Sequence, residues 1–181
     1  MGKYFGTDGF RGEANVKLTV DHAFQVGRYV GWYYGRDHKA KIVIGKDTRR
    51  SSYMFEYALV AGLTASGADA YLLHVTTTPS VSYVVRTEDF DCGIMISASH
   101  NPFYDNGIKL LNGNGQKIEA EIEARIEAYL DGRLEQLPYA TGEDIGRTVD
   151  FVSGRNRYIG HLISIPSCDF KNLKVGLDCS N

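Results

Sequence analysis

The fold is decided by a ten-residue stretch, Gly93-Ile94-Met95-Ile96 followed directly by Ser97-Ala98-Ser99-His100-Asn101-Pro102. Its first four residues are apolar without alternation, which is typical of a strand that helices cover on both faces. Serine, asparagine and proline favour turns, so the strand is expected to end where Ser97 begins the loop. A serine at the end of a buried strand is exposed and rigidly placed, which makes Ser99 a candidate functional residue.

Similar apolar runs lie earlier in the chain, at Ile42-Val43-Ile44-Gly45 and Ala70-Tyr71-Leu72-Leu73. Segments of helical period separate them, and one of these begins after Thr19, a residue that can cap a helix. This alternation of strands and helices predicts an α/β sandwich with helices on both faces of the sheet.

Glycines recur at Gly27, Gly31 and Gly35 in the segment after Thr19. A spacing of four puts them on one face of a helix, where the missing side chains permit close packing against a second helix. Charged residues such as Arg28 interrupt the segment, so a packing role is favoured over a membrane dimer motif.

A hairpin is predicted after the serine loop. Ile108-Lys109-Leu110-Leu111 and Gln116-Lys117-Ile118 flank Asn112-Gly113-Asn114-Gly115. Asn and Gly tolerate positive φ, as a tight hairpin turn requires. At least one pairing in the sheet is therefore expected to be antiparallel.

The C-terminal part is expected to begin a second domain. Residues 133–150 are polar and irregular and are predicted to be a linker, while residues 152–163 have helical period. Residues 173–178 are predicted to be a strand, which needs a partner strand and a covering helix, and neither follows. We therefore expect an α/β domain over residues 1–150. We expect the connecting helix and first strand of a truncated second domain over residues 151–181.

The composition is that of an ordinary globular protein. Of 181 residues, 43% are hydrophobic and 23% are charged, and 20 Lys+Arg against 22 Asp+Glu give a formal net charge of −2. Near-neutral charge argues against nucleic-acid or membrane-surface partners, because these need a basic field. No apolar run approaches the roughly 18 residues of a membrane span. The three cysteines form no C-x-x-C pair and are interpreted as free thiols of a cytoplasmic protein: Cys92, Cys168 and Cys179.

A glycine-rich segment near the start could bind an anion. In Gly6-Thr7-Asp8-Gly9-Phe10-Arg11-Gly12, three glycines frame a single guanidinium, which suits an arginine held close to an anion. The alternative is a glycine-rich turn with a solvated Arg11.

A second polar loop, Gly45-Lys46-Asp47-Thr48-Arg49-Arg50-Ser51-Ser52, follows the first apolar run. It could be an anion site at the N-terminus of a helix that Ser51 or Ser52 caps. Its spacing is not that of a Walker P-loop. An ion pair between Asp47 and Arg49 that shapes the loop is therefore the favoured interpretation.

The serine loop itself has two further interpretations, a simple turn and a hydrolase nucleophile. The hydrolase is disfavoured because the G-x-S-x-G elbow is absent. Neighbouring residues in extended backbone also point apart, so His100 is badly placed as a base for Ser99. A nucleotide-binding role for Gly113-Asn114-Gly115 is weaker than the hairpin that the same residues predict.

Together these segments resemble the α-D-phosphohexomutase family. Ile96-Ser97-Ala98-Ser99-His100-Asn101-Pro102 resembles the family's active-serine signature. Its continuation, Phe103-Tyr104-Asp105-Asn106-Gly107-Ile108-Lys109, is most similar to the bacterial phosphoglucosamine mutase branch. Residues 6–12 and 45–49 resemble further family motifs, in the family's order. The resemblance covers nearly the whole chain.

The resemblance implies a fold and a reaction. The fold is that of the family's first domain, a three-layer αβα sandwich with a mixed, mainly parallel sheet. The reaction is an isomerisation by intramolecular phosphotransfer, between glucosamine 6-phosphate and glucosamine 1-phosphate. It passes through a phosphoserine, with hexosamine 1,6-bisphosphate as intermediate and activator. A glucose or mannose phosphate substrate, and a non-catalytic anion-binding module, stay open as alternatives.

The resemblance also implies roles for individual residues. Ser99 would carry the phosphoryl group and Lys109 would act as general acid/base on the sugar hydroxyl. Arg11 and His100 would neutralise the phosphoryl group during transfer. Substrate contacts are implied for Thr7, Arg11, Ser99, His100, Asn101 and Lys109, and loop ordering for Asp47 and Arg49.

A magnesium ion is implied as well, bound through the phosphate on Ser99 and through carboxylates. The family's Asp-rich magnesium loop and its sugar- and phosphate-reading loops belong to later domains, and this sequence ends before them. We therefore expect a phosphosugar as substrate and the later domains of the same full-length chain as partners. Residues 1–181 alone are expected to be inactive, and the oligomeric state is left open.

Overall fold

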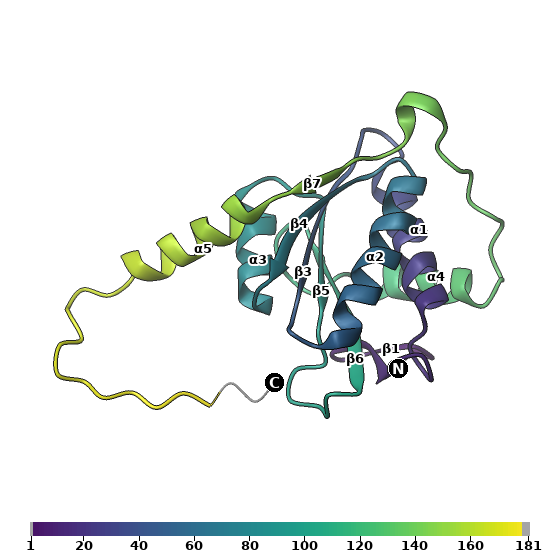
Figure 1. Ribbon diagram of the computed structural model, residues 1–181. Helices are drawn as coiled ribbons and strands as arrows, with labels where there is room; N and C mark the ends of the chain where they lie inside the picture. Colours follow the sequence, from purple (N-terminus) through teal and green to yellow (C-terminus); the bar gives the residue numbers. More distant parts are fainter. Residues whose placement is uncertain (1, 179–181) are drawn as a thin grey trace.

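Residues 2–178 are described by a computed structural model, in which one seven-stranded sheet has helices on both faces (Figure 1). The strand order is β1-β2-β6-β5-β3-β4-β7. The strands are β1 Phe5–Gly6, β2 Gly9–Glu13, β3 Lys41–Lys46, β4 Asp69–Val75, β5 Cys92–Ile96, β6 Asp105–Asn112 and β7 Thr148–Asp150. The helices are α1 Val20–Tyr34, α2 Arg50–Ala65, α3 Thr78–Thr87, α4 Ala120–Leu130 and α5 Val152–Ser164, with a 3-10 turn at Gly142–Asp144. This is the αβα sandwich that the sequence predicts.

The sheet has a parallel half and an antiparallel half. β5, β3, β4 and β7 pair in parallel, whereas β1, β2 and β6 pair antiparallel and β6 also pairs antiparallel with β5. The sheet is mixed as expected, but parallel pairings are not its majority. β1 and β2, and likewise β5 and β6, are joined by connections too short for the crossover of a dozen or more residues that parallel strands require.

Two apolar clusters fill the space between the sheet and its helices. α1, α2 and α4 cover one face and α3 covers the other, while α5 starts beside α3 and extends away from the sheet (Figure 1). In β5, Ile94 and Ile96 belong to the cluster under α1, α2 and α4, while Met95 belongs to the cluster under α3. Every residue of β5 is buried, because successive side chains of a strand point to opposite faces and both faces are covered.

α1 packs against α2 at the glycines that the sequence singles out. Thr19 begins α1: its Oγ1 accepts the backbone N–H of His22, and His22 Nδ1 accepts the N–H of Thr19 in return. A Cβ on Gly27 would lie 2.5 Å from the carbonyl oxygen of Leu59 in α2. The glycine therefore sets how closely the two helices approach.

The hairpin predicted after the serine loop forms only in part. Asn112 Oδ1 accepts the N–H groups of Asn114 and Gln116 and so shapes the expected turn. The second strand is a single bridge between Leu111 and Lys117. α4 begins at Ala120, which leaves no length for a longer pairing.

Two predictions for the C-terminal part are wrong. The predicted linker, residues 133–150, ends in β7, which pairs with β4, and Arg28 donates hydrogen bonds to the carbonyls of Leu137 and Pro138 in its middle. Three residues of strand are too few for a period to be recognised. Residues 173–178 form no strand, because within residues 2–178 no neighbouring strand pairs with them.

Cys92 is a buried free thiol and Cys168 an exposed one, while Cys179 lies outside the described residues. In the described part of the chain, no helix has the length and apolar character that crossing a bilayer requires.

Candidate active site

The glycine-rich segment near the start, residues 6–12, forms the end of β1, a turn and most of β2. β1 and β2 form a hairpin with Thr7 and Asp8 at its turn, and β2 pairs with β6 so that Arg11 lies opposite Gly107. Phe10 packs into the cluster under α1. Arg11 therefore points to the opposite face of the sheet, since side chains alternate along a strand.

Gly107 makes room for the Arg11 side chain. A Cβ at Gly107 would lie 2.9 Å from Cγ of Arg11 and 2.8 Å from the carbonyl oxygen of Ser97. The carbonyl of Gly107 accepts the N–H of Ser97, with an N–O distance of 2.9 Å. The stem of Arg11 thus lies against β6, directly beside the start of the serine loop.

The guanidinium of Arg11 is incompletely paired. Its Nη1 lies 3.6 Å from the carboxylate of Asp8. Its Nε is buried and has no hydrogen-bond partner within residues 2–178. A buried donor without a partner is uncommon, and this one is available to an anion that enters the site.

Lys109 lies on the same face of the sheet as Arg11. It is two residues beyond Gly107 on β6, opposite Met95 of β5, and is half-buried. Burial is the main cause that lowers the pKa of Lys109, the positive charge of Arg11 lowers it further, and the carboxylate of Asp8 acts in the opposite direction. A lysine with a lowered pKa has a larger neutral fraction, as a proton acceptor needs.

Ser99 lies at an exposed corner of the loop that leaves β5. Its φ is 58°, in the region that non-glycine residues rarely adopt, and its N–H donates to Ser97 Oγ at 3.0 Å. The N–H of Asn101 donates to the carbonyl of Ala98 and closes the turn. His100 is exposed next to Ser99.

The ion pair predicted between Asp47 and Arg49 is present. Arg49 Nε lies 2.9 Å from Asp47 Oδ2, and the guanidinium is almost completely buried. Its Nη2 donates to the carbonyls of Ser99 and Asn101, each at 2.8 Å. The pair therefore joins the loop after β3 to the serine loop after β5.

The prediction that Ser51 or Ser52 caps α2 is wrong. The helix begins at Arg50 without a side-chain cap. Ser52 Oγ donates to Asp47 Oδ1, which also accepts the N–H of Arg49. Asp47 thus shapes the turn before the helix, a role in which aspartate side chains are common, and leaves Ser52 inside a buried network.

The structure brings most of the predicted site residues to one edge of the sheet. Arg11 and Lys109 extend from adjacent strands, and the serine loop starts beside them. Thr7 is exposed at the β1–β2 turn and lines, with Lys109, a small cavity of about 90 Å³. Asn101 turns its side chain inward, where Nδ2 donates to Asp105 Oδ2 at 3.0 Å.

Two buried polar residues near this edge carry no sequence signal of their own. Lys46, at the end of β3, forms a buried ion pair with Glu56 of α2. Asn106 is fully buried and donates to the hydroxyls of Ser51 and Ser52. These partners lie on different elements, and no helical or strand period relates them.

The described residues do not make a complete magnesium site. Within residues 2–178, no three His, Cys, Asp or Glu side chains lie together closely enough to hold a metal ion. Mg²⁺ takes about six oxygen ligands, and a phosphate on Ser99 would offer only part of that number.

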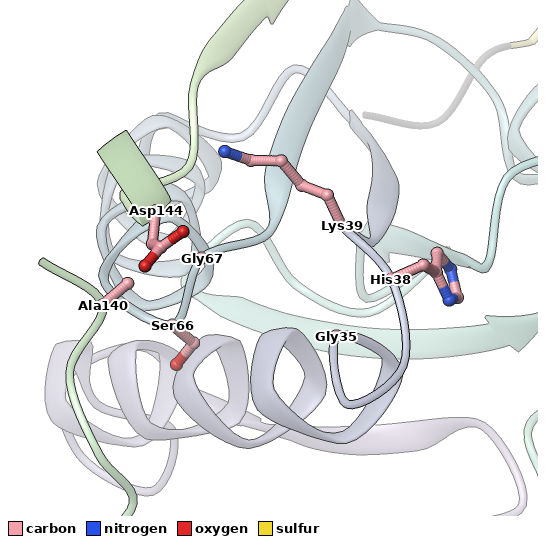
Figure 2. Close-up of a pocket in the computed structure, with 7 residues that line it drawn as sticks. All are labelled: Gly35, His38, Lys39, Ser66, Gly67, Ala140 and Asp144. Atoms are coloured by element: carbon pink, nitrogen blue, oxygen red, sulfur yellow. The ribbon is translucent and has the colours of Figure 1, made fainter. Parts of the chain in front are cut away.

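A separate cavity of about 320 Å³ lies at the opposite edge of the sheet (Figure 2). It lies between the C-terminal ends of α1 and α2 and is lined by Gly35, His38, Lys39, Ser66, Gly67, Ala140 and Asp144. In Figure 2, His38 points away from Ser66 and Asp144. Ligands of open α/β sheets bind at the carboxyl ends of the strands, where Ser99 lies, so we assign no function to this cavity.

A family model described as phosphoglucomutase/phosphomannomutase, alpha/beta/alpha domain I, matches residues 2–136. The chain belongs to this family.

Two relatives that are similar to the chain are named phosphoglucosamine mutase. A phosphoglucosamine mutase of Lachnospira eligens is 75% identical over 100% of this chain, and one of Lachnoclostridium phytofermentans is 73% identical over 100% of this chain. The chain spans 41% and 40% of these two proteins. Among solved structures, a putative phosphomannomutase from Thermus thermophilus is similar with a TM-score of 0.70 and 27% identity, over 88% of this chain and 35% of that one.

Proposed function

We propose that this chain is the phosphoserine-bearing part of a phosphoglucosamine mutase, which interconverts glucosamine 6-phosphate and glucosamine 1-phosphate. The observation that carries the proposal is that Arg11 and Lys109 share one face of adjacent strands, beside the start of the loop that presents the exposed Ser99. The names of relatives that are 75% and 73% identical to the whole chain support the glucosamine substrate.

The chemistry transfers a phosphoryl group between two oxygens. Lys109, as the neutral amine, takes the proton of the sugar hydroxyl, and that oxygen attacks the phosphorus on Ser99. The new O–P bond forms as the bond from phosphorus to Ser99 Oγ breaks. Lys109 then passes this proton to Ser99 Oγ as it leaves, so the products are the sugar 1,6-bisphosphate, the serine hydroxyl and the neutral amine. Transfer of the other phosphate back to Ser99 reverses these roles.

Arg11 supplies charge stabilisation in this step. Phosphoryl transfer depends mainly on positioning and on cations around the equatorial oxygens. The unpaired buried Nε of Arg11 is a donor that a phosphate oxygen would satisfy. His100, exposed next to Ser99, would add a second donor.

The same proposal extends to the cofactor, the compartment and the domains. Mg²⁺ would bind the phosphate on Ser99, and we assign it no step in the chemistry of residues 2–178. The free thiols Cys92 and Cys168 support a reducing, cytoplasmic setting. Residues 1–150 would be domain I, because β7 still belongs to its sheet, and residues 151–181 would connect it to a second domain.

A different sugar is the second candidate. The family model is described as phosphoglucomutase/phosphomannomutase, and the Thermus thermophilus structure as a putative phosphomannomutase. Identity of 27% to that structure, against 75% to the phosphoglucosamine mutase of Lachnospira eligens, makes this candidate the weaker one.

Phosphate loading of the chain tests the serine directly. Incubation with glucosamine 1,6-bisphosphate and Mg²⁺ should add one phosphate to the intact mass of a protein in which residues 1–181 replace the matching part of the Lachnospira eligens phosphoglucosamine mutase. Ser99→Ala should abolish the addition, while Ser153→Ala, an exposed serine on α5, should leave it unchanged. A phosphate that Ser99→Ala retains would contradict the assignment.

Turnover is best measured in a chimera in which residues 1–181 replace the matching part of the Lachnospira eligens protein. Glucosamine 6-phosphate should be isomerised faster than glucose 6-phosphate or mannose 6-phosphate, and Ser99→Ala should abolish all three activities. Preference for one of the other two sugars would favour the second candidate.

A further inference from the structure

The backbone of Ser99 is held in a conformation that it does not favour. Its φ of 58° is unusual for a residue with a Cβ, and such conformations persist only where the surroundings enforce them. Ser99 is also exposed, so packing of its side chain does not fix it. Hydrogen bonds to the backbone of the loop supply one such restraint.

The guanidinium of Arg49 provides that restraint. Nη2 donates to the carbonyls of Ser99 and Asn101, and Nη1 donates to those of Pro102 and Asp105. These four carbonyls span the whole serine loop from its corner to the start of β6. One rigid, planar cation thus fixes four points of the backbone relative to one another.

Arg49 has no donor left for a ligand. A guanidinium has five N–H groups. Four are directed at the loop carbonyls, and Nε donates to Asp47 Oδ2 at 2.9 Å. Arg11 differs in this respect, because its Nε lacks a partner within the described residues. The two arginines therefore suit different tasks, one structural and one toward an anion.

A buried network fixes Arg49 in turn. Asp47 Oδ1 accepts the hydroxyl of Ser52 at 2.7 Å, and Ser52 Oγ accepts Nδ2 of Asn106 at 3.0 Å. Asn106 Oδ1 accepts the N–H of Gly107 at 2.8 Å. The network thus ends at the β6 residue against which Arg11 lies. Ser52 and Asn106 are fully buried, so water does not compete for these bonds.

We propose that Arg49 is a positioning residue that holds Ser99 in register with Arg11 and Lys109, with Asp47, Ser52 and Asn106 fixing its guanidinium. The inference rests on the proposed function, because it assigns the network to the presentation of the phosphorylated serine. Arg49 acts through the loop backbone and contacts neither the phosphate nor the sugar.

Arg49→Lys tests this, with Arg50→Lys as the matched control. Lysine keeps the charge but cannot direct five donors in a plane, and Arg50 is the exposed neighbour in the sequence. In residues 1–181, Arg49→Lys should speed hydrogen exchange at the amides of Asn101 and Asp105 about tenfold or more, since charge-assisted bonds are lost. The amides of β3 and β5 should exchange as before.

In the chimera, Arg49→Lys should lower kcat on the order of 100-fold, the size expected when a reacting group moves by about 1 Å. KM should stay nearly constant, because the residue does not contact substrate. Arg50→Lys should match the unmodified chimera. Equal kcat in the two variants would overturn the inference, and so would a rise in KM without a fall in kcat.

A second variant covers the case in which Arg49→Lys does not fold. Ser52→Ala removes one bond to Asp47 and should give a smaller loss of kcat at constant KM, whereas unchanged kcat would overturn the inference. Ser99→Ala separates the two proposals. If it remains active, the proposed function fails. If it is inactive while Arg49→Lys behaves as Arg50→Lys does, only the positioning role fails.

Discussion

The surroundings of Lys109 move the pKa of its amine below the ordinary value for a lysine. Partial burial lowers its pKa, Arg11 lowers it further, and Asp8 partly offsets both. The antiparallel pairing of β2 with β6 creates this arrangement, because it places Arg11 and Lys109 on one face of neighbouring strands. Protonation of the Lys109 amine is therefore coupled to the charge of Arg11, the residue proposed to stabilise the phosphoryl group.

Replacing Arg11 should raise the pKa of Lys109. In Arg11→Gln the neighbouring cation is lost but burial stays, so the pKa should move only part of the way back to its ordinary value of 10.5. NMR titration of the Lys109 side chain in residues 1–181 measures the midpoint directly. A midpoint that is unchanged or lower in Arg11→Gln would contradict the coupling.

At the scale of residues, the sequence indicates the candidate reactive side chains but not the buried residues that support them. Ser99, Arg11 and Lys109 lie in motifs that are recognisable from their spacing, and the structure brings them to one edge. Asn106 and Ser52 carry no such signal. Their bonds join α2 to β6, and such contacts between distant segments follow no local period.

At the scale of elements, the packing of α1 on α2 depends on residues without side chains. Gly62 of α2 lies so close to α1 that a Cβ would collide with the carbonyl of Phe24. Gly160 of α5 has the opposite surroundings, with nothing within 4 Å of the Cβ position. Both glycines lie inside helices.

The same substitution should therefore have opposite effects at these two positions. Gly62→Ala should destabilise the chain by about 1–3 kcal/mol through overpacking. Gly160→Ala should stabilise α5 by up to about 1 kcal/mol, because alanine is the better helix former. Urea unfolding of the two variants measures both. A Gly62→Ala chain as stable as the unmodified one would show that the helices can separate without cost.

The elements that the sequence predicts well are those with a clear apolar pattern or a clear cap. α1 follows from its Thr19 cap and its glycine spacing, and β5 from its uninterrupted apolar run. β7 is too short to show a period and exists only because β4 offers an edge. Residues 173–178 have the composition of a strand but no partner among residues 2–178, and a strand is defined by its partner.

At the scale of the whole molecule, hydrogen bonds join residues 3–5 to α4. The carboxylate of Glu127 accepts the N–H groups of Lys3, Tyr4 and Phe5, at 3.0, 2.7 and 2.7 Å. Burial acts to raise the pKa of Glu127, but the three N–H groups outweigh it and hold the pKa below its ordinary value of 4.5. This carboxylate therefore secures the β1–β2 hairpin that carries Arg11.

The stability supplied by Glu127 should depend on pH. Because its pKa is lower in the folded chain than in the unfolded one, its contribution is fully present above about pH 4.5 and is lost as the pH falls through the folded value. Glu127→Gln should cost about 1–3 kcal/mol at pH 7, since it weakens three hydrogen bonds that are partly or fully buried. Glu135→Gln, an exposed residue, is the matched control. Urea unfolding at several pH values should show the Glu127→Gln deficit shrinking toward pH 3, and an equal deficit at all pH values would contradict the role.

The pairing of β2 with β6 also bears on how the chain folds during its synthesis. β2 is made early, but β6 leaves the ribosome only after β3, β4 and β5 have been made. β2, which carries Arg11, therefore has no β6 to pair with while the parallel strands around β3 come together. Arg11, although it lies near the start of the chain, is therefore placed beside the serine loop only after β6 has been made.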